Sequence, residues 1–253
     1  MANANHNLSQ WATIDDQAEI FAQGTFKNVW EGVYSDGPQK GQGCVCKQFK
    51  TGFVFESHYF AEEMTIIRRT QKIVDHFMNA EILGPDGSGR RLFLNTPEVW
   101  TCQVGGRKAL VEPMLGNFKK FNSNTGWASS TDDAWNEAMQ ALSHFSYHDS
   151  NRQFLLCDLQ GGMCPDGYIL TDPAIMSRAQ DCGPTDLGPA GVSAFFQRHK
   201  CGRFCAKHWA VPDETPLSEI PKREGTSMAV SAHWALPMRP ARKAANTLPK
   251  LRE

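Results

Sequence analysis

The sequence has almost no net charge and no long apolar run. Its 253 residues contain 26 Lys and Arg against 27 Asp and Glu, which gives a formal net charge of −1. A charge so close to zero gives no electrostatic reason to expect a nucleic acid as partner. No uninterrupted apolar segment approaches the roughly 18 residues that a membrane span needs. The sequence therefore predicts a protein that binds neither nucleic acid nor membrane.

A signal peptide is also missing, because the opening MANANHNLSQW has neither a charged start nor an apolar core. We therefore expect a cytoplasmic protein. In that compartment, eight cysteines indicate free thiols or metal ligands rather than a disulfide framework. A hydrophobic content of 41% and a charged content of 21% are typical of globular proteins. The length suffices for one large domain or two closely packed lobes.

Residues from about 12 to 115 predict a sheet crossed by one long helix. Aromatic and β-branched residues flank a Gly/Pro/Asp turn in residues 25–50, which is the pattern of a hairpin. Apolar residues recur at helical spacing in residues 56–80 and predict a long amphipathic helix. Two or three more strands are expected around the Gly-Gly turn of residues 92–115. Residues 1–11 are polar, and we expect a flexible leader there.

The pattern changes after Gly116. Thr131 followed by two acids predicts the start of a second helix. A buried strand, FLLC, then ends abruptly at Asp158. The segment of residues 192–210 predicts a further helix through Phe195 and Phe196. Residues 212–253 are rich in Pro, Ser, Thr, Lys and Arg and predict a flexible tail.

Lys47 follows CVC in what the pattern predicts to be a central strand. A lysine is costly there unless it is paired, so it either faces solvent or reaches the phosphates of a nucleotide. Glu63 on the long helix is a candidate ion-pair partner, although its neighbour Glu62 is equally placed. Glu112, in ALVEPML, is either a charge at a strand end or part of a hinge beside an adenine.

Asp158, Gln160 and Asp172 form a second candidate group. Each aspartate closes or follows a predicted strand and lies next to a turn, in CDLQGG and LTDP. Two carboxylates and an amide at strand ends suit magnesium, which prefers oxygen ligands and often bridges to phosphate. An aspartate in this position can also orient a hydroxyl that attacks phosphorus. The alternative for Asp172 is that it only starts a turn before Pro173.

The run HKCGRFC carries a metal-ligand pattern. His199, Cys201 and Cys205 have H-x-C-x3-C spacing, which is compatible with three zinc ligands. His208 is a local candidate for the fourth ligand and His144 a distant one. A site with four protein ligands would be structural, and the alternative is unliganded thiols. A zinc-dependent nucleic-acid-binding protein is also conceivable from this run, but the sequence lacks a basic stripe.

With these groups in view, the sequence resembles the alpha-kinases, the atypical serine/threonine kinases that include myosin heavy chain kinases, elongation-factor kinases and melastatin-type channel-kinases. The matching segments follow the family's order over residues 14–210. They are GTFKNVWEGVY, CVCKQFK, LVEPML, KKFNSNTGW, ALSHFSYHDSNRQFLLCDLQGG, LTDP, GPTDLGPAGVSAFFQRHKC and RFC.

The resemblance implies an α+β, two-lobed fold like that of conventional protein kinases. The N-terminal lobe, about residues 12–115, would hold the sheet and the long helix. The C-terminal lobe, about residues 116–211, would be mixed and would hold a structural zinc site. The kinase domain would thus span residues 12–211, between the leader and the tail.

The resemblance also implies ATP-dependent phosphorylation of a protein hydroxyl with magnesium. Lys47 would contact the ATP phosphates, and Glu112 would lie at the hinge near the adenine. Asp158 would be the catalytic aspartate, and Gln160 and Asp172 would help to hold magnesium. The expected partners are ATP and a protein substrate that the sequence does not identify.

The family's zinc ligands correspond to His144, His199, Cys201 and Cys205, which excludes His208. Lys27 and Glu63 are expected on the nucleotide-binding side, Lys27 standing where an arginine is common. Asn122 and Gly126 fall in the motif KKFNSNTGW, without a derivable role.

Two further departures from the family pattern accompany this resemblance. Asp186 stands where an asparagine is common, and the run GMCPDGYIL before Asp172 is longer than usual. Neither removes a residue that phosphoryl transfer needs. The alternative is a catalytically weak pseudokinase that binds nucleotide and a structural zinc, but the presence of Lys47, Asp158 and Asp172 argues against it.

Overall fold

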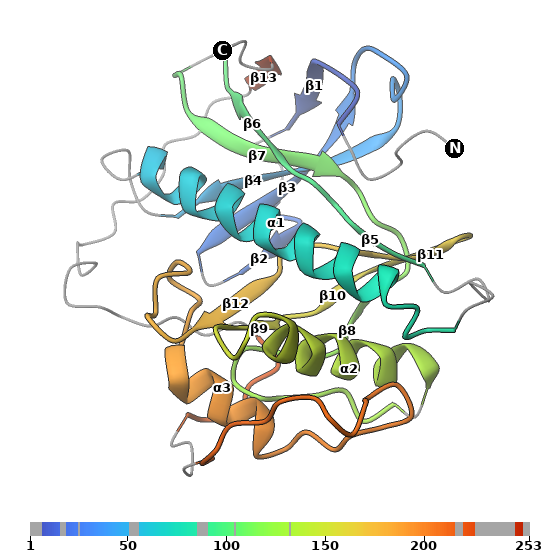
Figure 1. Ribbon diagram of the computed structural model, residues 1–253. Helices are drawn as coiled ribbons and strands as arrows, with labels where there is room; N and C mark the ends of the chain where they lie inside the picture. Colours follow the sequence, from blue (N-terminus) through green and yellow to red (C-terminus); the bar gives the residue numbers. More distant parts are fainter. Residues whose placement is uncertain are drawn as a thin grey trace. The chain divides into compact units, whose positions relative to one another are not determined.

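The computed structural model describes residues 7–15, 19–24, 26–50, 56–84, 91–103, 105–131, 133–215, 220–225 and 246–249. The chain divides into two compact units, whose elements Figure 1 labels. The first unit comprises Met1–Ala61, Asn95–Leu115 and His233–Glu253, and the second Glu62–Leu94 and Gly116–Ala232. Among the described residues, no helix has both the length and the apolar character that a membrane span requires.

The first unit is built on a seven-stranded sheet in which every pair of strands is antiparallel. The strand order is β13-β1-β3-β4-β7-β6, and β2 pairs with β3. The strands are β1 (Trp11–Ile14), β2 (Ala22–Gln23), β3 (Lys27–Tyr34), β4 (Gly43–Phe49), β6 (Glu98–Thr101), β7 (Lys108–Pro113) and β13 (Asn246–Pro249). The predicted hairpin is confirmed as β3 and β4. Cys44 and Cys46 are fully buried in β4, as small apolar side chains of a central strand should be.

Residues from the expected leader and from the expected tail contact this sheet. The Asn7 side chain donates to the Val111 carbonyl and accepts from the Tyr34 hydroxyl. β13 lies within the expected tail and pairs with β1, Trp11 opposite Pro249. Buried amides and unpaired strand edges are stabilised by such partners, and composition alone does not reveal them. The boundaries of the kinase domain stay a prediction.

The second unit contains two smaller sheets and the helices. A four-stranded sheet has the order β5-β11-β10-β8, and β12 pairs with β9. The strands are β5 (Arg91–Leu94), β8 (Phe118–Lys120), β9 (Phe154–Cys157), β10 (Gln160–Cys164), β11 (Gly167–Leu170) and β12 (Ala174–Ser177). The helices are α1 (Glu56–Asn79), α2 (Ala134–Asp149) and α3 (Gly188–Phe196). The long helix is confirmed as α1, but its residues from Glu62 onward belong to this unit and not to the first.

The core of the second unit joins α1 to α2 and to the strands. Phe77 and Phe145 are buried and meet edge to face, with ring centroids 5.3 Å apart. Leu142 and Leu156 are also fully buried in this cluster. Burial of each such side chain contributes about 1.5–3 kcal/mol relative to exposure. In Figure 1, α2 lies beside β9 and α3 beside β12, so this packing fixes the strand that ends at Asp158.

The start of α2 differs from the prediction by two residues. Asp133, not Thr131, is the N-cap, and its carboxylate accepts from the Asn136 N–H at 2.8 Å. The Thr131 hydroxyl instead lies 2.9 Å from that of Ser129. Thr and Asp are both good caps, so composition did not distinguish them.

Candidate active site

The first unit contains a buried ion pair. Glu112 on β7 pairs with Val45 on β4, two residues before Lys47, so the two charged side chains lie on one face of the sheet. Lys47 Nζ lies 2.5 Å from Glu112 Oε1, and the two side chains are only 5% and 3% exposed. The solvent-facing alternative for Lys47 is therefore wrong. The lysine is buried, and Glu112 compensates its charge.

The structure says less about the other residues that were predicted to lie near the nucleotide. Glu112 lies shortly before Leu115, where the first unit reaches its boundary, so its place in the chain suits a hinge. Glu63 belongs to the second unit, and its pairing with Lys47 stays a prediction. Lys27 Nζ lies 5.8 Å from the centroid of the Phe49 ring, and its contact with a nucleotide also stays a prediction.

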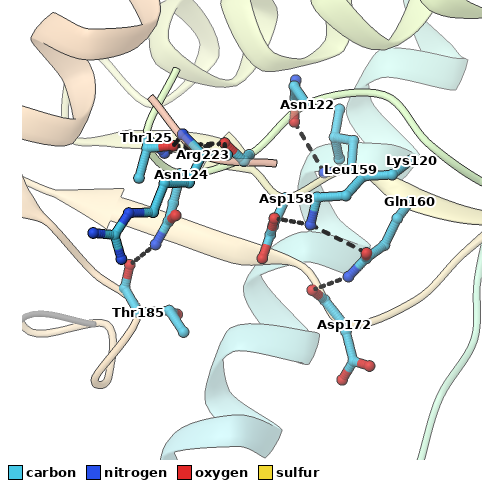
Figure 2. Close-up of polar contacts among 11 residues, drawn as sticks. Lys120, Asn122, Asn124, Thr125, Asp158, Leu159, Gln160, Asp172, Thr185 and Arg223 are labelled. Atoms are coloured by element: carbon cyan, nitrogen blue, oxygen red, sulfur yellow. Dashed lines mark hydrogen bonds and ion pairs between the residues drawn. The ribbon is translucent and has the colours of Figure 1, made fainter. Parts of the chain in front are cut away.

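A second polar group lies in the second unit, where β9 ends next to β8 and β10 (Figure 2). Asp158 is 2% exposed, and its Oδ1 lies 2.5 Å from Lys120 Nζ. The same ammonium donates to Gln160 Oε1 at 3.2 Å, because Gln160 is directly opposite Lys120 in the β10–β8 pair. Lys120 was not identified from the sequence. Its only signal is its place in the motif KKFNSNTGW.

Strand register brings Asp172 to the same end of the β9–β12 pair as Asp158. Cys157 pairs with Ala174 in antiparallel register, so the residue after β9 and the residues before β12 are neighbours. The Gln160 amide reaches the Asp172 carbonyl at 3.5 Å, and Figure 2 shows the Asp172 carboxylate directed away from Gln160. Both aspartates have positive φ, 59° and 47°. Backbone strain of this kind concentrates at functional sites, and aspartate tolerates it better than most residues.

The long run before Asp172 forms a hairpin. β10 and β11 pair from Gly161 opposite Leu170 to Cys164 opposite Gly167. At the base, the Thr171 N–H donates to the Gln160 carbonyl at 2.9 Å. The additional residues therefore extend the strands and return the chain to the same place, so they do not displace Asp172 from Gln160.

The loop after β8 supports the backbone next to Asp158. Asn122 Oδ1 accepts from the Leu159 N–H at 3.0 Å, and its amide donates to Ser143 Oγ at 3.0 Å. Gly126 closes the loop with a φ of +76°, and a Cβ there would lie 2.2 Å from the Ala194 carbonyl oxygen. This gives Asn122 and Gly126 positioning roles that the sequence did not supply.

Asp186 anchors the glycine-containing loop before α3. It is fully buried, and its Oδ1 accepts from the Ser177 and Gly188 N–H groups at 3.0 and 2.7 Å. Its Oδ2 accepts from Ser177 Oγ at 2.6 Å and from the Cys182 N–H at 3.0 Å. All four partners act as donors here, so a carboxylate fits and an amide, with its own N–H groups, would fit less well. We assign Asp186 a structural role.

The predicted metal ligands come together. His144, His199, Cys201 and Cys205 place their ligand atoms within 4.8 Å of one another. His144 Nδ1 lies 3.2 Å from His199 Nε2 and 3.6 Å from Cys201 Sγ, and each sulfur lies 3.7 Å from His199 Nε2. Zinc–nitrogen bonds of about 2.0 Å and zinc–sulfur bonds of about 2.3 Å give tetrahedral edges of about 3.3 Å (N–N) and 3.5 Å (N–S). The residues therefore fit tetrahedral zinc.

The surroundings of the cluster favour a bound cation. His144 Nε2 lies 3.1 Å from the Ala210 carbonyl, which orients the ring with Nδ1 toward the other ligands. Burial lowers the pKa of His144 and lowers that of His199 to about 4, which favours the neutral imidazole that a metal binds. Burial raises the pKa of the Cys205 thiol to about 12, a cost to the thiolate that a metal would offset. His208 stays outside the cluster, with its ring 5.4 Å from that of His148.

Comparison with known families agrees with this geometry. The family model described as "Alpha-kinase family" matches residues 22–205. The chain is 43% identical over 93 residues to Alpha-protein kinase vwkA of Dictyostelium discoideum, covering 36% of this chain and 15% of that protein. It is 34% identical over 123 residues to human Eukaryotic elongation factor 2 kinase, covering 48% and 16%. It is 34% identical over 183 residues to human Transient receptor potential cation channel subfamily M member 6, covering 66% and 9%. The chain thus spans less than a fifth of these relatives.

Solved structures show the same fold. An alpha kinase from Entamoeba histolytica superposes with a TM-score of 0.64 at 20% identity, covering 86% of this chain and 85% of that one. The alpha-kinase domain of myosin heavy chain kinase A in complex with ADP gives 0.59 at 22% identity, covering 77% and 86%. The inactive form of that domain complexed with ATP gives 0.60 at 20% identity, covering 81% and 99%. The mixed α+β fold expected from the sequence is confirmed.

Proposed function

Because the chain belongs to the alpha-kinase family, we propose that it is an ATP-dependent protein kinase that transfers the γ-phosphate to serine or threonine hydroxyls. The observation that carries the proposal is the buried Asp158 held by Lys120 at 2.5 Å, within a match that covers residues 22–205. Phosphoryl transfer depends on positioned charge more than on covalent chemistry, and these groups supply it. The nucleotides named for the structural relatives support ATP as the donor.

In the second unit, Asp158 would accept a hydrogen bond from the acceptor hydroxyl and orient it toward phosphorus. Lys120 would hold that carboxylate in place and offset negative charge that develops on the transferred group. Gln160 and Asp172 offer an amide and a carboxylate oxygen, the ligands that magnesium prefers. Bound magnesium would neutralise the phosphate oxygens.

In the first unit, Lys47 would contact the phosphates of ATP. Its pairing with Glu112 compensates the buried ammonium, which would offer a positive charge to the phosphates. Glu112, near the end of β7, would also lie beside the adenine. Lys27 and Glu63 would also contribute to nucleotide binding.

We also propose that His144, His199, Cys201 and Cys205 hold a structural zinc. Four protein ligands close the coordination sphere, so the metal would support folding and not chemistry. It would tie α2 to the segment after α3. A cytoplasmic location stays a prediction from the sequence, which does not identify the protein substrate.

Transfer of labelled phosphate from magnesium-ATP to myelin basic protein, a generic basic acceptor, tests the function. The variant Asp158→Asn is the sharpest comparison, because asparagine also tolerates the positive φ of this residue and removes only the charge. We expect transfer by the wild type and a loss of at least about 100-fold in the variant. Nucleotide binding without any transfer by folded wild-type protein would instead support the pseudokinase alternative.

A further inference from the structure

A segment from far along the chain lies against the loop that follows β8. Residues 220–225 contact this loop through the main chain of Arg223 (Figure 2). The Arg223 N–H donates to Thr125 Oγ1 at 2.8 Å. The Arg223 carbonyl accepts from Ser123 Oγ at 2.6 Å and from Thr125 Oγ1 at 2.8 Å. Two hydroxyls thus satisfy both main-chain polar groups of one residue, as a residue on the edge of a neighbouring β-strand would.

The loop that carries the two hydroxyls is held by hydrogen bonds of its own. Ser123 and Thr125 are fully buried, and so is Asn124 between them. The Ser123 N–H donates to the Trp127 carbonyl at 2.9 Å, which closes the loop. The Asn124 amide donates to the Thr185 carbonyl at 2.8 Å, so the loop anchored by Asp186 holds the other side. A rigid arrangement of this kind reduces the entropy cost of binding a peptide.

The same loop holds the catalytic group. Asn122, next to Ser123, accepts from the Leu159 N–H directly after Asp158. Three extended residues span at most about 11 Å, so Thr125 lies within that distance of Asn122 along the chain. A polypeptide held at Ser123 and Thr125 therefore passes close to the residues that would act on its hydroxyl.

We infer that Ser123 and Thr125 form a main-chain clamp for the acceptor polypeptide, and that residues 220–225 occupy this clamp in cis. The inference rests on the proposed kinase function and names how its substrate is held. All three hydrogen bonds use the Arg223 main chain, and the residue is exposed. The ligand class is therefore an extended peptide of broad sequence that has no proline at the clamped position.

Occupancy in cis makes the segment a competitor of the substrate. A segment tethered to the same chain binds as an intramolecular competitor, so it lowers the apparent affinity for the acceptor. The apparent affinity falls in proportion to the fraction of molecules with a free clamp.

Arg223→Pro tests the clamp, because proline has no N–H to donate to Thr125. We expect this variant to show a KM for myelin basic protein at least about fivefold lower, with kcat and the KM for ATP unchanged. Arg223→Ala is the matched control and should behave as the wild type, because it keeps the N–H. An unchanged KM for the acceptor in Arg223→Pro, or an equal fall in Arg223→Ala, overturns the inference.

A binding measurement makes the test independent of catalysis. A fluorescent synthetic peptide of residues 218–226 is titrated into Arg223→Pro protein without ATP, and unlabelled myelin basic protein is added as competitor. We expect the peptide to bind and the competitor to displace it. Adding Thr125→Val should weaken peptide binding at least about tenfold, while the melting temperature of the protein stays unchanged. No binding, or binding that the competitor does not displace, overturns the clamp. If the peptide binds and is displaced but the protein transfers no phosphate, the result supports the clamp and contradicts the proposed kinase function.

Discussion

Lys47 on β4 and Glu112 on β7 form an ion pair 2.5 Å long from which solvent is almost completely excluded. Removing one member of a buried pair costs about 3–5 kcal/mol, because the other charge loses its partner. Removing both costs less. The burial of this pair therefore predicts an effect on the free energy of unfolding that does not depend on any catalytic role.

We expect Lys47→Met to lower the free energy of unfolding by about 3 kcal/mol or more, and Lys47→Met/Glu112→Gln to recover at least about 1 kcal/mol of that loss. Urea denaturation of wild type, both single variants and the double variant at pH 7 measures the coupling. Simple additivity of the two single changes would show that the two charges do not depend on one another.

Lys120 and Lys119 offer a matched pair for the catalytic group. Lys120 contacts Asp158, whereas Lys119 contacts Asp133 at the start of α2. We expect Lys120→Met to lower kcat for phosphate transfer by about 100-fold or more, because it removes a fixed charge beside Asp158, the proposed catalytic carboxylate. Lys119→Met should retain kcat within about threefold. Equal effects of the two changes would contradict the assigned role of Lys120.

Zinc content is the direct check on the histidine–cysteine cluster. Purified protein should contain one zinc per chain by elemental analysis, and Cys201→Ser should lose it. Because structural zinc supports folding, we expect the variant to melt about 10 °C or more below the wild type. Cys164→Ser is the control, since that free thiol lies outside the cluster. If a chelator removes the metal from the wild-type protein and the melting temperature does not change, the zinc has no structural role.

The elements that the sequence predicted best are those with local signals. The helical spacing of α1 and the strand–turn pattern of β3 and β4 depend on residues that are close together in the sequence. Both elements were therefore predicted correctly. The ion pair of Lys47 and Glu112 was not found, because it depends on the register between two strands. The register is fixed by the packing of the whole sheet, so it cannot be inferred from the sequence of either strand alone.

The candidate site shows the same division. Asp158 and Gln160 stand out because they end an apolar run. Lys120 does not, since a lysine at the end of a three-residue strand resembles any solvated charge. His144 lies in a helix 55 residues before His199, and only the family resemblance assigned it. Spacing alone favoured His208 equally.

Gly126 is a position where a single methyl group should be decisive. Its φ of +76° disfavours any Cβ, and the Ala194 carbonyl oxygen would lie 2.2 Å from it. We expect Gly126→Ala to lower the free energy of unfolding by about 3 kcal/mol or more. Gly24→Ala is the control, because its Cβ would meet only the Lys27 carbonyl, at an ordinary 3.8 Å. A loss below about 1 kcal/mol in Gly126→Ala would mean that the loop rearranges freely.

Asp133 makes α2 sensitive to acid. Partial burial raises its pKa, but hydrogen bonds from Lys119 and the Asn136 N–H outweigh this and hold the pKa below its ordinary value of 3.8. A lowered pKa gives stability that is present above 3.8 and is lost as the pH falls through the folded value. The carboxylate is partly exposed, so we expect Asp133→Asn, which keeps the cap, to cost at most about 1 kcal/mol at pH 7.

Urea denaturation of both proteins between pH 7 and pH 2.5 measures this difference in unfolding free energy. It should stay constant down to about pH 5 and shrink toward zero below pH 3. A difference that persists at pH 2.5 would assign the effect to the shape of the cap and not to its charge.

The β10–β11 hairpin has a consequence for how this part of the chain can evolve. Its base is closed by the Thr171–Gln160 hydrogen bond, so one residue added to each strand near the tip leaves the base unchanged. A single unmatched residue would instead force a bulge, because side chains alternate between the two faces of a strand. Related chains are therefore free to differ here in steps of two residues, and the separation of Gln160 and Asp172 in sequence can grow while their separation in space stays the same.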